Sequence, residues 1–101
     1  MIEKVTEYSI DQSEALRNMI TEDSLIINHV VMDPGQSFPA HITEYEVHII
    51  IISGHISIQI ENQEPHEYSS GNMITLPKGI VSAMANHSGK KTEIFAIKNV
   101  R

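Results

Sequence analysis

Apolar and polar side chains alternate in short segments along most of the chain, and glycine, proline or other turn-forming residues separate these segments. A period of two places successive side chains on opposite faces of a β-strand, so the pattern predicts strands rather than helices. In the stretch 56–61, for example, Ile56, Ile58 and Ile60 share one face. The predicted strands span residues 2–8, 15–21, 24–32, 45–53, 56–61, 73–76, 81–86 and 92–98, and a short further strand begins at Tyr68.

The stretch DQSEALR, residues 11–17, also has features of a helix start. Asp11 is a suitable N-cap, and Glu14 lies three residues after it, as in a capping box. No helical face continues after Met19, however. We therefore expect a turn followed by a strand over residues 15–21.

Short strands at regular spacing, separated by Gly or Pro turns, predict an all-β protein built as an antiparallel sandwich or barrel. Each strand buries little by itself, whereas closure into a barrel gives the strands a shared core and removes exposed edges. The 101 residues are expected to form a single domain, residues 1–101.

The charge and composition exclude several classes of partner. The chain has 13 acidic and 7 basic residues, a net charge of −6, and its basic residues are scattered. A nucleic-acid backbone would be repelled, so no nucleic acid is expected as a partner. The absence of cysteine excludes disulfides and thiolate metal sites. No apolar run has the length of a signal peptide or a bilayer span, so we expect a cytoplasmic protein without a membrane partner.

Two segments carry a more specific pattern. Residues 34–54 read PGQSFPAHITEYEVHIIIISG, and residues 71–86 read GNMITLPKGIVSAMAN. Together they resemble the paired signatures of the cupin family, G-x5-H-x-H-x3/4-E-x6-G and G-x5-P-x-G-x2-H-x3-N. The matching residues are Gly35, His41 and Gly54 in the first signature and Gly71, Pro77, Gly79 and Asn86 in the second. The resemblance covers about residues 25–98 and implies a cupin-like double-stranded β-helix, the jelly-roll barrel.

In the cupin family, two histidines and a glutamate of the first signature and a histidine of the second hold a metal. The corresponding residues here are His41, Thr43, Val47 and Ser82. Valine has no donor atom and neutral hydroxyls are weak ligands, whereas a catalytic metal site needs about three protein ligands. We therefore predict no metal at the family's position and no other cofactor.

A displaced site for a divalent transition metal is the alternative. A β-bulge before Gly54 would turn Glu46 or His48 inward, where either could join His41. A third ligand would then come from His29 or His87. The simpler interpretation is that His48 and His87 are surface residues.

The resemblance also implies which side chains face the barrel interior. If His41 and Thr43 face inward, strict alternation places Tyr45, Val47, Ile49 and Ile51 inside and Glu44, Glu46, His48, Ile50 and Ile52 outside. The second signature contributes Ser82 and Met84. We therefore expect a small-molecule pocket whose ligand-binding residues are His41, Thr43, Tyr45, Ser82 and Met84.

Ile50 and Ile52 are too apolar for a solvent-facing surface, and exposed apolar patches usually mark contacts. The pattern therefore predicts a homodimer that covers this face. The alternative is that the N-terminal strand of the same chain covers it.

Three functions remain open. The first is binding of a small molecule in the barrel without the family's metal. The second is an enzyme, either metal-dependent through the displaced ligands, like the dioxygenases and isomerases of the family, or metal-free with His41 as acid or base. His41 is the only catalytic candidate. The third is an interaction module whose barrel is plugged by its own side chains.

Overall fold

The computed structural model describes residues 2–7, 16–22 and 24–100. Within these ranges the chain forms nine β-strands and no helix. The described residues accordingly contain no helix that could cross a membrane. The strands are β1 (Leu16–Glu22), β2 (Leu25–Met32), β3 (Ser37–Ile42), β4 (Glu46–Ser53), β5 (His55–Ile60), β6 (His66–Ser69), β7 (Met73–Leu76), β8 (Val81–Ala85) and β9 (Thr92–Asn99).

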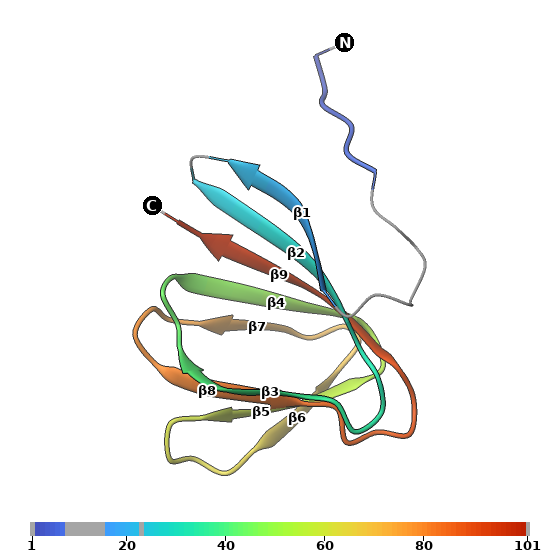
Figure 1. The fold of residues 1–101 in the computed structure, drawn as a ribbon, viewed down its shortest axis with the longest axis vertical. Helices are drawn as coiled ribbons and strands as arrows, with labels where there is room; N and C mark the ends of the chain where they lie inside the picture. Colours follow the sequence, from blue (N-terminus) through green and yellow to red (C-terminus); the bar gives the residue numbers. More distant parts are fainter. Residues whose placement is uncertain (1, 8–15, 23, 101) are drawn as a thin grey trace.

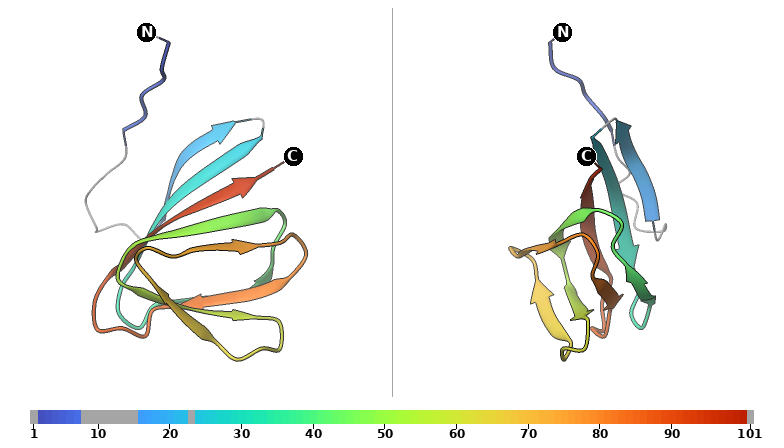
Figure 2. Two further views of the ribbon diagram at one scale, coloured as in Figure 1. Left: turned by 180° about the vertical axis from the view of Figure 1, so that it is seen from behind. Right: turned by 90° about the vertical axis from the view of Figure 1, so that its left-hand side faces the viewer.

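The strands form two antiparallel sheets that face each other (Figures 1 and 2). The five-stranded sheet has the order β1-β2-β9-β4-β7, and the four-stranded sheet has the order β3-β8-β5-β6. The connections β2 to β3, β4 to β5, β6 to β7 and β8 to β9 all pass from one sheet to the other. This is the jelly-roll arrangement, so the predicted all-β barrel is confirmed.

The N-terminal part of the chain differs from the prediction. Residues 2–7 form no strand, extend away from the barrel (Figure 1) and are exposed. A β-strand forms only when a neighbouring strand pairs with it through hydrogen bonds, and the alternation of side chains does not show whether such a neighbour exists. Tyr8 and residues 11–15, including Asp11 and Glu14, lie outside the described residues, whereas the predicted strand over 15–21 corresponds to β1.

Alternation along β4 decides which of its side chains enter the core. Val47, Ile49 and Ile51 are buried, with 9%, 1% and 2% of their surface exposed, whereas Ile52 remains 45% exposed. Ile56 and Ile58 of β5 meet the inward side chains of β4 from the opposite sheet. Burial of each such aliphatic side chain contributes about 1.5–3 kcal/mol, so the core between the sheets dominates the stability of the barrel.

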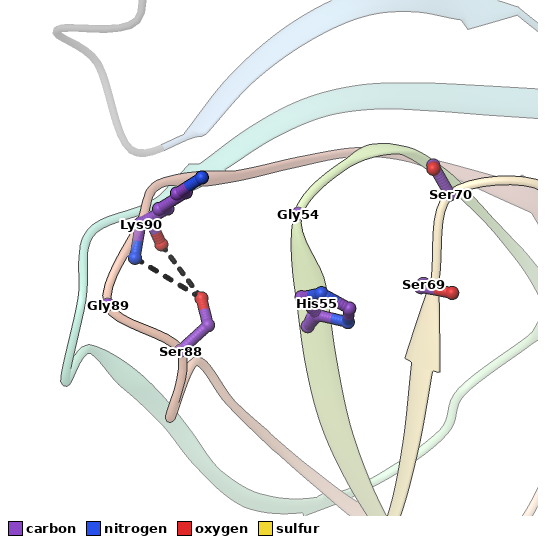
Figure 3. A pocket seen from close by; sticks show the side chains of 7 residues that line it. All are labelled: Gly54, His55, Ser69, Ser70, Ser88, Gly89 and Lys90. Atoms are coloured by element: carbon purple, nitrogen blue, oxygen red, sulfur yellow. Dashed lines mark hydrogen bonds between the residues drawn. The ribbon is translucent and has the colours of Figure 1, made fainter.

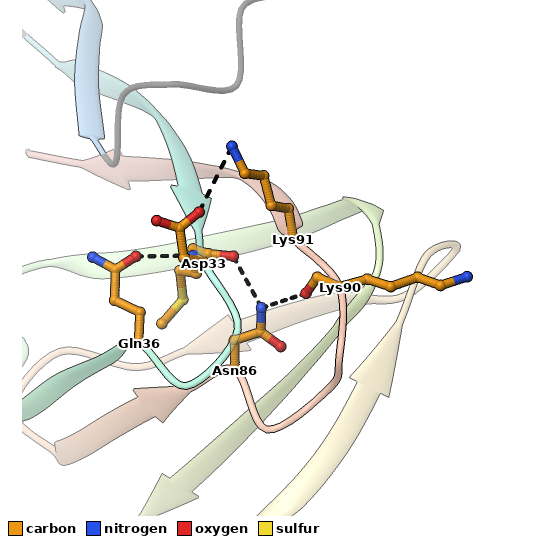
Figure 4. A network of polar contacts seen from close by, with 6 residues as sticks. Asp33, Gln36, Asn86, Lys90 and Lys91 are labelled. Atoms are coloured by element: carbon orange, nitrogen blue, oxygen red, sulfur yellow. Dashed lines mark hydrogen bonds and ion pairs between the residues drawn. The ribbon is translucent and has the colours of Figure 1, made fainter.

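The turns at one end of the barrel are joined by the side chain of Asn86, which is fully buried (Figure 4). Its Nδ2 donates hydrogen bonds to the carbonyl oxygens of Met32 at 2.9 Å and Lys90 at 2.7 Å. Its Oδ1 accepts from the backbone N–H of Ser88 at 3.0 Å and from the Ser88 hydroxyl at 2.7 Å. Asn86 thereby connects the end of β2 with the loop between β8 and β9.

Gly54 makes a second close approach at the same end. Its φ is +83°, and an added Cβ would lie 2.5 Å from Thr92 Oγ1 and 2.8 Å from the Lys91 carbonyl oxygen. Thr92 cannot move away freely, because its hydroxyl donates to the His55 carbonyl at 2.6 Å and accepts from the His55 N–H at 3.1 Å. Only glycine fits at this position.

Gly54→Ala should therefore destabilise the barrel more than Gly71→Ala. At Gly71 the φ is +94°, but an added Cβ would meet nothing within 4 Å. Gly71→Ala is the control, and it should lose only about 1–2 kcal/mol of unfolding free energy through backbone strain. Gly54→Ala should lose about 1–3 kcal/mol more, because the added methyl group overpacks the site. Urea denaturation measures both free energies of unfolding, and equal losses would show that Thr92 does not constrain Gly54.

Candidate functional site

A cavity of about 210 Å³ lies between the two sheets, toward the end of the barrel that carries the β3–β4 and β7–β8 connections. Most of its wall is aliphatic or aromatic, and its polar residues come from β2, β3, β8, β9 and the β3–β4 connection. The cavity is lined by Asn28, Val30, Phe38, His41, Thr43, Val47, Ile49, Leu76, Ser82, Met84, Ala96 and Lys98.

Four of the five residues predicted to bind a ligand line this cavity: His41, Thr43, Ser82 and Met84. Tyr45 instead lines an adjoining hollow of about 300 Å³, to which His41, Thr43 and Val47 also contribute. Tyr45 precedes the first residue of β4. The strict alternation that holds inside the strand therefore does not extend to it.

His41 reaches the cavity because β3 is irregular. His41 pairs with Ser82 of β8, Phe38 pairs with Met84, and the register shifts between Phe38 and His41. Although three positions apart, Phe38 and His41 both line the cavity. Regular alternation would have placed them on opposite faces.

The His41 ring is oriented by its own strand. Its Nδ1 lies 3.2 Å from the carbonyl oxygen of Pro39. A carbonyl can only accept, so Nδ1 carries the proton of this hydrogen bond, and Nε2 of the neutral ring is then an acceptor. The side chain is exposed at the cavity mouth.

Thr43 holds the mouth of the cavity together. Its hydroxyl donates to the Pro77 carbonyl at 2.7 Å and accepts from the Ile80 N–H at 3.1 Å. Its backbone N–H donates to the Ile80 carbonyl at 2.8 Å, and its carbonyl accepts from the Gly79 N–H at 2.9 Å. The hydroxyl proton is thus used to link two connections, so Thr43 shapes the wall instead of offering a donor to a ligand.

Ser82 differs from Thr43 in this respect. It is 3% exposed, but its hydroxyl makes no hydrogen bond to another residue in the part of the chain that the structure describes. Because it lines the cavity, the hydroxyl is available to a ligand.

Two polar residues of the wall, Asn28 and Lys98, were missed in the sequence. A signal was present, because Ala96 and Lys98 are two positions apart on β9, and Asn28 and Val30 are two positions apart on β2. Extending the alternation of these strands toward their ends would have placed both polar side chains inside.

The residues proposed for a displaced metal site do not converge. A bulge is present before Gly54, but it lies between Ile51 and Ser53, after His48. His48 therefore stays on the outer face, where Nδ1 lies 2.9 Å from Thr75 Oγ1 and Nε2 lies 3.2 Å from Glu46 Oε1. The inward position between Glu46 and His48 is occupied by Val47.

The other candidate ligands are also separate from the cavity. His29 is 3% exposed, and its Nε2 lies 2.5 Å from Glu93 Oε2, beside the ring of Phe95. His87 is exposed in the β8–β9 loop at the other end of the barrel. Among residues 2–7, 16–22 and 24–100, no three His, Cys, Asp or Glu side chains are grouped to hold a metal ion. The described donor set does not fit the family's metal.

A larger and more open hollow, about 610 Å³, lies at the opposite end of the barrel (Figure 3). It lies between the β8–β9 loop and the adjoining ends of β5 and β6, and its lining is small and polar. Buried apolar walls are what usually distinguish a binding pocket from a surface groove. The smaller cavity around His41 is therefore the better candidate site. The larger hollow is lined by Gly54, His55, Ser69, Ser70, Ser88, Gly89 and Lys90.

Comparison with known proteins agrees with this fold. Residues 28–98 match the family model described as a cupin domain. The chain is also 33% identical over 99 residues to an uncharacterized protein of Methanocaldococcus jannaschii, covering 97% of this chain and 85% of that protein. The chain belongs to the cupin family.

Solved structures give the same result. A crystal structure of an RmlC-like cupin family protein from M. jannaschii, with a double-stranded β-helix fold, matches at a TM-score of 0.90 and 33% identity, covering 98% of this chain and 92% of that one. The cupin domain of Cnp3 from Schizosaccharomyces pombe matches at a TM-score of 0.78 and 14% identity, and the match covers 85% of this chain and 60% of that one. The DMSP lyase DddQ from Ruegeria pomeroyi matches at a TM-score of 0.76 and 22% identity, and the match covers 84% of this chain and 46% of that one. The last two likenesses concern the fold alone, because one fold serves many functions.

The role of Thr43 can be tested with Thr43→Val, which keeps the shape of the side chain but removes the hydroxyl. The Pro77 carbonyl and the Ile80 N–H, which are in partly buried hydrogen bonds, would each lose a partner, so the free energy of unfolding should fall by about 1–3 kcal/mol. Thr75→Val is the matched control, because Thr75 is on the outer face and its hydroxyl contact with His48 is exposed to solvent. Chemical denaturation compares the two variants, and a loss no larger than the control's would contradict the structural role.

Proposed function

We propose that this cupin binds a small molecule with an apolar body in the cavity between its sheets, without the family's metal. The observation that carries the proposal is the cavity itself, about 210 Å³ in volume, with an apolar wall and a few polar groups near its mouth. Small-molecule sites commonly have this form, in which apolar walls supply affinity and sparse polar groups fix the orientation of the ligand.

The two alternatives have less support. A plugged barrel would leave no internal space, whereas Val47, Ile49 and Leu76 surround a cavity here. A metal-dependent enzyme with displaced ligands would require Glu46 or His48 beside His41, and both lie on the outer face of the five-stranded sheet. Metal-free acid–base chemistry at His41 would itself begin with binding of a substrate in this cavity.

Titration of the isotope-labelled protein with 1-hexanol tests the proposal. This alcohol has an apolar chain short enough for the cavity and one hydroxyl for the mouth. The methyl resonances of Val47, Ile49 and Leu76 should shift and saturate, while those of the exposed Ile2 should stay unchanged.

Ala96→Leu provides the control, because Ala96 lines the cavity and a larger side chain there would fill it. The variant should lose the saturable shifts while keeping its fold, and Met84→Trp should do the same from the opposite sheet. Circular dichroism verifies the fold of each variant. Absence of saturable shifts in the unmodified protein across short-chain alcohols, or equal binding by the filled variants, would contradict the proposal.

We also propose that two copies pair through the outer patch, defined as Ile50, Ile52 and Met73. Ile50 pairs with Met73 across β4 and β7. Met73 is 61% exposed and Ile52 is 45% exposed, and adjacent exposed apolar side chains of this kind favour a contact. Residues 2–7 do not cover the patch, because they extend away from the barrel. A second copy of the chain is therefore the proposed partner.

Sedimentation equilibrium of Ile52→Asp tests the pairing. The unmodified protein should have twice the chain mass of 11.3 kDa, and the variant should dissociate because burial of its unpaired carboxylate is costly. Ile42→Asp is the control, because Ile42 is 63% exposed on β3 of the other sheet and should leave the mass unchanged. A single-chain mass for the unmodified protein would contradict the proposal.

A further inference from the structure

Lys98 has an unusual position for a lysine, because it lies on the inward face of β9. Its register partners are Val47 of β4 and Ile26 of β2. Lys98 lines the cavity together with Ala96 and Val47, and it is partly buried. A methylene stem can pack against apolar neighbours, but the ammonium group needs water or an anionic partner.

The cavity wall supplies no such anion. The described lining of the cavity contains no Asp or Glu. Glu44 shares the adjoining hollow with Lys98 but is exposed, and no ion pair joins the two side chains within the described residues. Glu46 points to the outer face, where it pairs with His48. The ammonium group of Lys98 at the cavity mouth is therefore available to an anionic ligand.

The neighbouring polar groups complement this charge. The Ser82 hydroxyl, on the cavity wall, has no partner among the described residues and can donate a hydrogen bond to an oxyanion. The Thr43 hydroxyl is already donated to Pro77, and the Nδ1 proton of His41 is directed to the Pro39 carbonyl. Among Lys98, Ser82, Thr43 and His41, the first two are thus suited to a negatively charged head group.

We propose that the ligand is a small monocarboxylate with a short aliphatic chain. Its carboxylate lies near Lys98 and Ser82 at the mouth, and its chain packs on the apolar wall formed by Val30, Ile49 and Leu76. A charge-assisted hydrogen bond in a partly desolvated site is stronger than a neutral one, so Lys98 discriminates the acid from an uncharged analogue. This inference rests on the proposed function, because it identifies the chemical class of the ligand for the same cavity.

The test compares hexanoate with 1-hexanol, which have similar chains but different head groups, by titration monitored with methyl resonances at neutral pH. The unmodified protein should bind hexanoate about tenfold more tightly than 1-hexanol. Lys98→Met keeps the apolar stem and removes the charge, so it should abolish the preference while retaining affinity for 1-hexanol. Lys78→Met removes the same charge from an exposed position of the β7–β8 connection and should preserve the preference.

The outcomes separate the two proposals. If neither compound binds to the cavity, the proposed function fails and the carboxylate inference fails with it. If both compounds bind with equal affinity, or if Lys98→Met weakens both equally, only the carboxylate inference is overturned. Loss of the preference in Lys78→Met would overturn it as well, because a charge outside the cavity lining would then explain the selectivity. Added salt should reduce the hexanoate preference, as expected for an ion pair open to solvent.

Discussion

The barrel depends on buried polar side chains that join its connections where the two sheets meet. At one end the amide of Asn86 links β2 to the β8–β9 loop, and at the other end the hydroxyl of Thr43 links the β3–β4 and β7–β8 connections. Backbone groups in such connections have no partners in a strand ladder, and leaving them unpaired inside the protein is costly. These two side chains satisfy them, and the apolar cavity lies in the space between the sheets.

Thr43 illustrates how a family position can change its role. The cupin resemblance places a metal ligand at this position, yet here the side chain forms a hydrogen-bonded crosslink across the barrel mouth. Val47, at a second ligand position, contributes to the apolar wall. Positions that hold a metal elsewhere in the family thus line an apolar cavity in this chain, whose polar residues are Asn28, His41, Thr43, Ser82 and Lys98.

Much of the fold and part of the candidate site could be predicted from the sequence. Alternation with a period of two, bounded by isolated glycines, predicted most of the strands. The same alternation correctly placed Val47, Ile49 and Ile51 in the core. The irregularity in β3 could not be predicted, because a bulge depends on pairing with β8 and leaves no periodic signal. Lys98 was not predicted because charged residues are mostly exposed, although its spacing of two from Ala96 on β9 indicates that it faces inward.

The position of β9 has a consequence for how the barrel folds. Although β9 follows every other described strand in sequence, it lies between β2 and β4 in the five-stranded sheet (Figure 1). While the chain is being synthesised, β2 and β4 therefore lack their shared neighbour until residues 92–99 have emerged. Pairing between segments so distant in sequence is slow, because the entropy of closing long loops is lost before the contacts form. The wall that carries Ala96 and Lys98 is thus completed last, and the chain acquires its cavity only when the five-stranded sheet closes.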